Sequence, residues 1–248
     1  MKTLPIAVSG LRRLATNAEA LRNLRERVRL RISRQALSLA FDLTHIDRVR
    51  MQAFRLAHHF VVDHPEGVDV DVLDAACLLH ELGRGQEEPG ENRGQASARL
   101  AEDLLRAVGL ADLVWPVCET ILTADTASGR KPSEPEAKLL HDAHLLDDLG
   151  AIGLWRFALS ADLRGIPALY PPADPGARER DLDPAGFLLD ALPTQAFALP
   201  ERMMTPYAKV EAERRVAFMR TFYQQVLSEA TPDSPTGSRP TSSRPTSA

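Results

Sequence analysis

The chain has 248 residues, of which 44% are hydrophobic, enough for one large folded domain or two small ones. Its formal net charge of −4 favours neither a nucleic acid nor an anionic membrane as a partner. Cys77 and Cys118 lie in apolar helical patterns, which predicts buried thiols in a reducing compartment. Apolar runs are shorter than the ~20 residues that span a bilayer, and the N-terminus makes a poor signal peptide, so we expect a cytoplasmic protein.

Helical periodicity continues almost to residue 230 with few β-branched runs, which predicts an all-α fold. Ser133 and Glu136 fit a capping box, Pro135 suits a first helical turn, and Gly150 should end that helix. Segment 164–200 is rich in Pro, Gly and Asp and should be irregular or contain one short helix. We expect helices at 11–32, 35–63, 69–83, 95–108, 111–125, 134–149, 151–163 and 207–229.

Three regions follow from this pattern. Residues 1–33 form an N-terminal helical extension that caps the bundle or mediates dimerisation, and residues 34–230 form the main helical domain. Residues 231–248 contain only small, polar, Pro and Arg residues, so they cannot offset the entropy of ordering and should be a disordered tail. The sequence is also compatible with a homo-oligomer.

Ligand-type side chains interrupt the apolar faces of three predicted helices. His45 is the polar member of one face, His80 and Glu81 end the run AACLLHEL, and Asp142 shares a face with leucines. A buried unpaired carboxylate is costly, so a positive group should lie among them. One divalent ion would satisfy all four side chains, and these ligand types suit Mn, Fe, Co, Ni or Zn, with Mg also open.

Each of these residues also has a structural interpretation. A single histidine on an apolar face is more often a core residue hydrogen-bonded to a carbonyl. Glu81 could pair with an arginine, and Asp142 could be a buried cap. The joint pattern across three helices favours the metal.

The segments THIDRV, AACLLHELG and KLLHDAHLLDDLGAIG resemble the HD superfamily of metal-dependent phosphohydrolases, whose pattern is His, a His-Asp pair and a later Asp. The third segment is similar to the family's DAD-x-L-D-x-x-GAIG signature. The resemblance covers residues 35–230 and implies an all-α HD-domain bundle with the metal at its centre. It also implies His45, His80, Glu81 and Asp142 as ligands, and phosphoester hydrolysis by metal-activated water.

The sequence departs from that family pattern at two positions. The pair is His-Glu, and the second Asp of the signature is His144, which we expect to be solvated or to support a ligand from behind. Between His80 and His141 the sequence contains no histidine that could supply a second metal, so a single ion is predicted.

Arginines near the predicted ligands could bind an anionic substrate. Arg48 lies one helical turn from His45, Arg84 one turn from His80, and Arg156 follows the GAIG turn. Glu87 and Glu88 are weaker candidates for a general base. The remaining histidines are interpreted as structural or surface residues, namely His58, His59, His64 and His141.

Two functions are compatible with these features. The first is a mononuclear metal-dependent phosphohydrolase acting on a small phosphorylated molecule, such as a nucleotide or another phosphomonoester. The second is a degenerate HD-fold pseudoenzyme that acts as a binding or assembly module, consistent with the His-Glu pair. The four ligand-capable positions favour the enzyme.

Overall fold

A computed structural model describes residues 11–12, 17–34, 39–64 and 67–231. The described part is mainly helical, with one short parallel pairing of two strands and irregular connecting segments. The long helices are α1 (Ala18–Ile32), α2 (Leu43–Asp63), α3 (Val70–Leu79), α4 (Arg93–Ala107), α5 (Val114–Ala124), α6 (Pro135–Asp147), α7 (Gly150–Leu163) and α9 (Pro206–Ala230). The shorter elements are β1 (Leu11–Arg12), β2 (Val68–Asp69), α8 (Leu188–Ala191) and the helical turns η2 (Leu39–Phe41), η3 (Ala111–Leu113), η4 (Leu192–Ala196) and η5 (Leu199–Arg202). The predicted all-α fold is confirmed.

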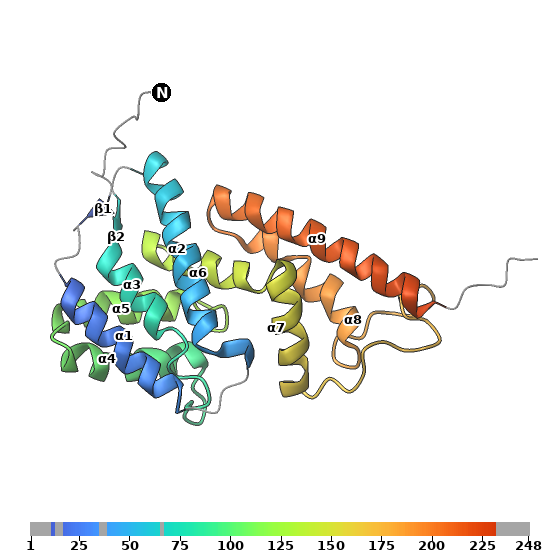
Figure 1. Cartoon of the computed structure of the whole chain (residues 1–248), viewed down its shortest axis with the longest axis horizontal. Coiled ribbons are helices and arrows are strands. Elements are labelled where there is room, and N and C mark those ends of the chain that lie inside the picture. The colour runs from blue at the N-terminus through green and yellow to red at the C-terminus, as the bar shows by residue number, and fades with distance from the viewer. Residues whose placement is uncertain (1–10, 13–16, 35–38, 65–66, 232–248) are drawn as a thin grey trace, which may run out of the picture.

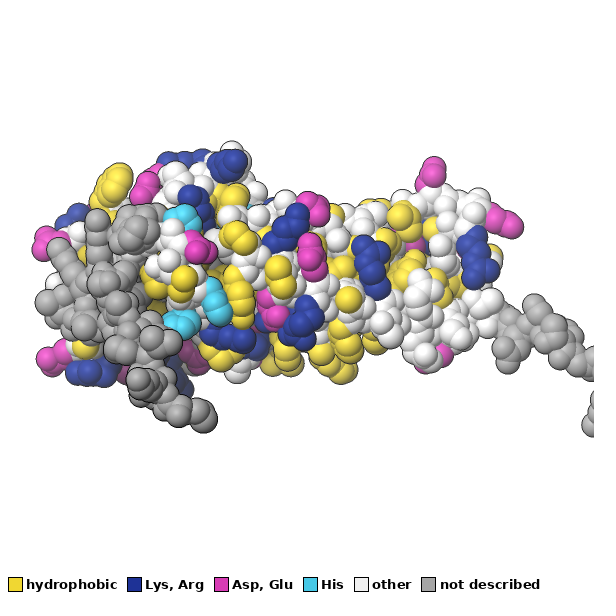
Figure 2. Space-filling view, turned by 90° about the horizontal axis from the view of Figure 1, so that it is seen from above, with side chains coloured by type: hydrophobic (Ala, Val, Ile, Leu, Met, Phe, Trp, Pro, Cys, Tyr) yellow, Lys and Arg dark blue, Asp and Glu magenta, His cyan; other side chains and the backbone are white. Residues whose placement is uncertain are grey.

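The molecule is elongated, with helices α1 to α6 bundled at one end and α7 to α9 extending from them (Figure 1). Helix α9 contacts α7, α6 and α2, and so joins the extension to the bundle. On the face shown in Figure 2, basic and acidic side chains are interspersed with hydrophobic ones along the length of the molecule. No helix in the described part of the chain is long and apolar enough to cross a membrane.

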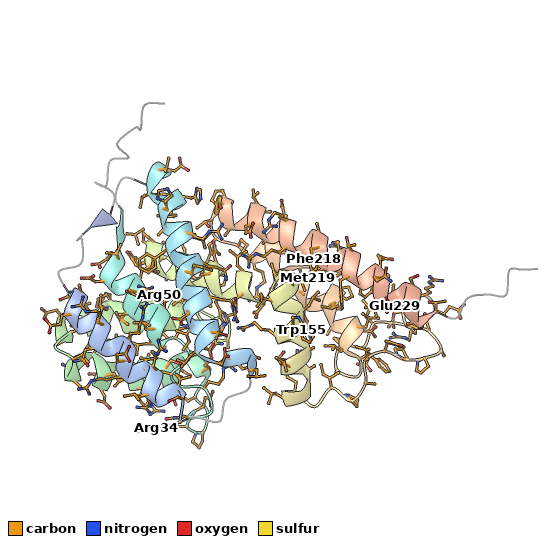
Figure 3. The ribbon with its side chains drawn as sticks, viewed as in Figure 1. Arg34, Arg50, Trp155, Phe218, Met219 and Glu229 are labelled. Atoms are coloured by element: carbon orange, nitrogen blue, oxygen red, sulfur yellow. The ribbon has the colours of Figure 1, made fainter. Side chains whose placement is uncertain are left out.

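Helix α3 lies at the centre of the bundle and contacts α1, α2, α5 and α6. Eight of its ten residues are buried, as expected for a largely apolar helix that is covered on most sides. Leu73 and Leu79 are fully buried, and each contributes about 1.5–3 kcal/mol through removal of its side chain from water. Arg50 of α2 reaches this helix and pairs with Asp74 (Figure 3). Because α3 is central, the residues that follow its C-terminal end are also placed inside the protein.

Helix boundaries differ from prediction where a side chain starts or stops a helix. Helix α2 begins at Leu43, later than expected, because the Asp42 side chain accepts a hydrogen bond from the amide of His45. Helix α1 begins at Ala18. Helix α3 ends at Leu79, and the chain then turns through Gly85, which has a φ of +73°.

The predicted capping box at the start of α6 is wrong. The Glu136 carboxylate accepts a hydrogen bond from the amide of Asp69, and Ser133 bonds to the neighbouring Glu134. A capping box does form at α4, where the Asn92 side chain and Gln95 exchange hydrogen bonds with each other's backbone. Segment 164–200 contains the short helix α8 and two helical turns, close to expectation. The predicted disordered tail covers residues 231–248, and from residue 232 onward it lies outside the described part of the chain.

The turn after α3 packs against α4 through a glycine. The amide of Gly83 donates to the Ser97 hydroxyl, which donates in turn to the carbonyl of His80. A Cβ on Gly83 would lie 2.3 Å from the Ser97 backbone nitrogen, too close for any side chain.

We predict that Gly83→Ala lowers the free energy of unfolding by about 1–3 kcal/mol, because the turn must move away from α4. The matched control is Gly176→Ala, where the added Cβ would meet Leu227 at an ordinary distance of 3.4 Å. Chemical denaturation of both variants measures the difference. Equal stability of the two variants would contradict the proposed close packing.

Candidate metal centre

Four side chains from three parts of the fold meet inside the bundle. His45 comes from the first turn of α2, His80 and Glu81 from the end of α3, and His144 from α6. Their candidate ligand atoms all lie within 4.8 Å of one another. His45 and Glu81 are fully buried, and the side chain of His144 is 12% exposed. The cluster therefore contains three of the four predicted ligands and one residue that was not predicted to be a ligand.

The cluster has a regular shape. The centroids of the three imidazole rings are 5.4, 5.5 and 5.6 Å apart. Oxygen Oε1 of Glu81 lies 3.7 Å from Nε2 of His45, 3.8 Å from Nε2 of His80 and 3.6 Å from Nε2 of His144. One carboxylate oxygen thus faces three ring nitrogens at nearly equal distances.

The three Nε2 atoms are buried and have no hydrogen-bond partner among the described residues. On the outer side, His45 Nδ1 lies 2.8 Å from Asp147 Oδ2, and His80 Nδ1 lies 2.8 Å from the carbonyl oxygen of Cys77. A carbonyl can only accept, so His80 Nδ1 carries the proton and His80 Nε2 presents a lone pair inward. His45 Nδ1 contacts the Arg156 guanidinium as well as the Asp147 carboxylate. Buried polar atoms without a partner usually indicate a missing ion or water.

The protonation states suit a cation. Burial lowers the pKa of His80 to about 3 and holds that of His144 well below its usual value, so both rings are neutral at pH 7. Burial alone would raise the pKa of Glu81, but Arg93, the imidazoles of His144 and His45, and Arg84 together hold it well below normal. Neutral imidazoles at His80 and His144, together with the Glu81 carboxylate, therefore fit a divalent ion.

Asp147 orients His45 from behind. Its carboxylate accepts hydrogen bonds from His45, from Arg48 at 2.8 and 3.0 Å, and from Arg156 at 2.7 Å. Although burial acts in the opposite direction, the bonds from His45 and Arg48 and the charge of Arg156 keep the pKa of Asp147 low. A carboxylate behind a ligand histidine fixes the ring orientation and makes the ring a stronger donor.

Asp142, the fourth predicted ligand, is not in the cluster. Its carboxylate accepts hydrogen bonds from the amides of Met204 and Thr205 and from the Thr205 hydroxyl, at 2.7–2.8 Å. These groups immediately precede α9, so Asp142 stabilises the start of that helix, where a negative charge is favourable. The structure thus places Asp142 as a buried cap.

The reason lies in the geometry of α6. Residues 142 and 144 are separated by about 200° around the helix, so they face opposite sides. The apolar face that includes Asp142 packs toward the start of α9. His144 faces the first turn of α2 and the C-terminal end of α3. His144 was expected to be solvated or supporting, and the structure places it in the cluster. Its spacing from Asp147, one helical turn away, is the signal in the sequence that could have identified it.

A cleft of about 630 Å³ opens beside the cluster, between the bundle and the extension. His144, Asp148 and Phe41 line it, and five arginines surround it: Arg84, Arg93, Arg156, Arg164 and Arg202. Two predicted anion-binding residues, Arg84 and Arg156, are among them. Arg48 is not, because its guanidinium is bound to Asp147 on the other side of His45. Sequence analysis missed Arg93, Arg164 and Arg202, which lie far from the motifs along the chain.

The other candidate residues lie outside the cluster. His141 bonds to the carbonyls of Ala124 and Arg202, as expected of a structural histidine. His59 stacks on Tyr207. Glu88 pairs loosely with Arg99, and neither Glu87 nor Glu88 lines the cleft.

No family model matches the sequence, and no curated protein matches it. Solved structures do share its fold. A protein of Lactobacillus plantarum has a TM-score of 0.65 at 22% identity, over 87% of this chain and 98% of its own. An HD-superfamily hydrolase of Bacillus thuringiensis has a TM-score of 0.64 at 26% identity, over 86% and 98%. YpgQ of Bacillus subtilis, in complex with ADP, has a TM-score of 0.60 at 20% identity, over 84% and 97%.

The chain therefore has the fold of the HD superfamily, and the predicted resemblance is confirmed. These neighbours and the buried cluster together support a metal-dependent hydrolase.

We predict that Asp142→Ala lowers the free energy of unfolding by on the order of 2–4 kcal/mol, because buried amides before α9 lose their acceptor. The folded variant should still bind the metal in the same molar ratio as the unmodified chain. Denaturation combined with elemental analysis tests both points, with Glu81→Ala as the matched variant that should lose the metal. Loss of metal from folded Asp142→Ala would contradict this assignment.

The metal-free protein should lose stability as the pH falls below about 6.5, the ordinary pKa of histidine. The unfolded chain then binds a proton at His80, whereas the folded chain does not until about pH 3. This one group lowers the free energy of unfolding by up to about 1.4 kcal/mol per pH unit. His80→Gln should reduce the slope between pH 6.5 and 4.5 by about one proton, and an unchanged slope would contradict the assignment.

Proposed function

We propose that the chain is a mononuclear metal-dependent phosphohydrolase that acts on a small phosphorylated molecule. The observation that carries the proposal is the position of the cluster. Three imidazole nitrogens that have no hydrogen-bond partner among the described residues converge with one carboxylate oxygen beside a cleft. The described residues that line this cleft include five arginines and one acidic residue, Asp148. A cleft lined by more basic than acidic side chains attracts an anionic substrate to the metal.

The arginines of the cleft fall into two groups. Arg84, Arg93 and Arg156 are bound to carboxylates at the cluster, so they set its charge and geometry. Arg164 and Arg202 are exposed at the outer part of the cleft. Arg164 bonds to Gln195, and no described residue accepts a hydrogen bond from the Arg202 guanidinium. Arg202 is therefore available to a phosphate group, which arginine binds with two parallel hydrogen bonds. Arg164 donates to the Ser160 carbonyl and to Gln195, so its remaining Nη2 can supply one further bond.

In this proposal His45, His80, Glu81 and His144 hold the ion. Bound there, it would polarise a phosphoryl oxygen and lower the pKa of a water molecule. Arg202 and Arg164 would orient the phosphate. Asp148 lines the cleft one turn beyond His144, and burial raises its pKa, so it is the proposed group for proton transfer.

Phe41 closes one wall of the cleft. The Arg84 guanidinium lies 3.5 Å from the centroid of its ring, a cation–π contact that holds the arginine against Glu81.

The complex of YpgQ with ADP supports a nucleotide as one candidate substrate. Other phosphomonoesters fit the same charge pattern and belong in the same substrate screen.

We expect the protein, loaded with each divalent ion in turn, to release phosphate from at least one nucleotide or sugar phosphate. His144→Ala should abolish turnover, because the ion loses a ligand. Arg202→Gln should raise KM several-fold with little change in kcat, because it removes a binding contact distant from the reacting bond. Arg22→Gln, an exposed arginine on α1 outside this cleft, is the control and should leave both constants unchanged.

Colorimetric phosphate release measures all of these effects. Stoichiometric metal binding without hydrolysis of any tested phosphoester would refute the proposed activity. The cluster would then be interpreted as a structural metal site in a non-catalytic HD-fold protein.

A further inference from the structure

We infer that this metal centre selects zinc or cobalt(II) over manganese and magnesium, and that His144 determines the selectivity. The inference rests on the metal centre of the proposed function and goes beyond it by naming the class of ion and the responsible residue. It follows from the donor atoms, their geometry and the partners of Glu81.

The donor atoms are three imidazole nitrogens and one carboxylate oxygen. Imidazole suits zinc, cobalt, nickel and iron, whereas magnesium and manganese prefer carboxylate, carbonyl and water oxygens. The ligand set predicted from the sequence would have had two imidazoles and two carboxylates. With His144 in place of Asp142, the centre exchanges one hard oxygen for a nitrogen and carries one negative charge in place of two.

Glu81 can offer only one oxygen to the ion. Its Oε2 accepts from Arg84 Nε. Its Oε1 accepts from Arg93 at 2.9 Å and from Arg84 Nη2 at 3.2 Å while facing the three imidazoles. Bidentate binding would break the contact with Arg84. The protein therefore supplies a single oxygen donor beside three nitrogens, so the other oxygen ligands that magnesium or manganese prefers would have to come from water.

The spacing of the donors matches a compact, four-ligand geometry. Glu81 Oε1 lies 3.6–3.8 Å from each of the three Nε2 atoms. An ion with bonds of about 2.1 Å to four tetrahedral ligands would have ligand atoms about 3.4 Å apart. The distances from Oε1 exceed this value by about 0.2–0.4 Å, and all four donor atoms lie within 4.8 Å of one another. Zinc and cobalt accept this geometry and can add a fifth ligand during catalysis.

The experiment uses the full chain stripped of metal by a chelator and then titrated with zinc, cobalt, manganese or magnesium ions. Calorimetry, with a competing chelator for tight binding, measures each Kd without reference to activity. Nearly any site prefers zinc to manganese, so the informative quantity is the ratio of the two Kd values in the unmodified chain and in His144→Asp. The ratio should shrink by about tenfold or more in the variant, because a nitrogen donor becomes an oxygen donor.

His58→Asn is the matched control, because it removes an exposed histidine of α2 outside the cluster and should leave the ratio unchanged. The visible absorption of the cobalt form is a second measurement that needs no variant. Intense d–d bands are expected for four or five ligands, and weak bands for six.

An unchanged ratio in folded His144→Asp, weak six-coordinate cobalt bands, or magnesium binding as tight as zinc would each overturn the inference. If His144→Asp does not fold, the cobalt spectrum and the magnesium titration of the unmodified chain decide alone. Zinc selectivity without hydrolysis would support this inference and refute the proposed activity. Hydrolysis with a manganese-selective centre would do the reverse.

Discussion

The fully buried carboxylate of Glu81 is the constraint on which the site depends. A carboxylate at this depth is stable only if positive or polar groups surround it, and here Arg84, Arg93 and three imidazoles do so. Those partners come from α2, α4, α6 and the turn after α3. The packing of four parts of the fold around one charge therefore defines the position of the candidate metal centre.

The supporting contacts extend this arrangement outward. Asp147 fixes His45 and is itself held by Arg48 and Arg156, so arginines lie on both sides of the cluster. Arg156 also bonds to Asp148 at the edge of the cleft. The same side chain thus connects the orientation of a ligand to the wall of the proposed substrate site. Substitution of Arg156 would disturb both at once, which makes the outer arginines better probes of substrate binding.

Asp142, which was predicted as a ligand, and Asp147 have different functions on α6 in the structure. Asp142 stabilises the start of α9, and so helps to attach the extension to the bundle. Asp147 supports His45. His144 lies between them in sequence and is the residue of α6 that reaches the cluster. One face of α6 therefore contacts the extension at the start of α9, and the opposite face contributes His144 to the candidate metal centre.

The all-α class and most helix positions can be predicted from the sequence alone, as can His45, His80 and Glu81 as candidate ligands. Apolar periodicity and polar residues on apolar faces are local properties that a single chain reveals. The fourth member of the cluster was decided by tertiary structure, because both faces of α6 are buried and only the neighbouring helices distinguish them. The same holds for Arg93, Arg164 and Arg202, which come together only when distant segments pack around the cleft.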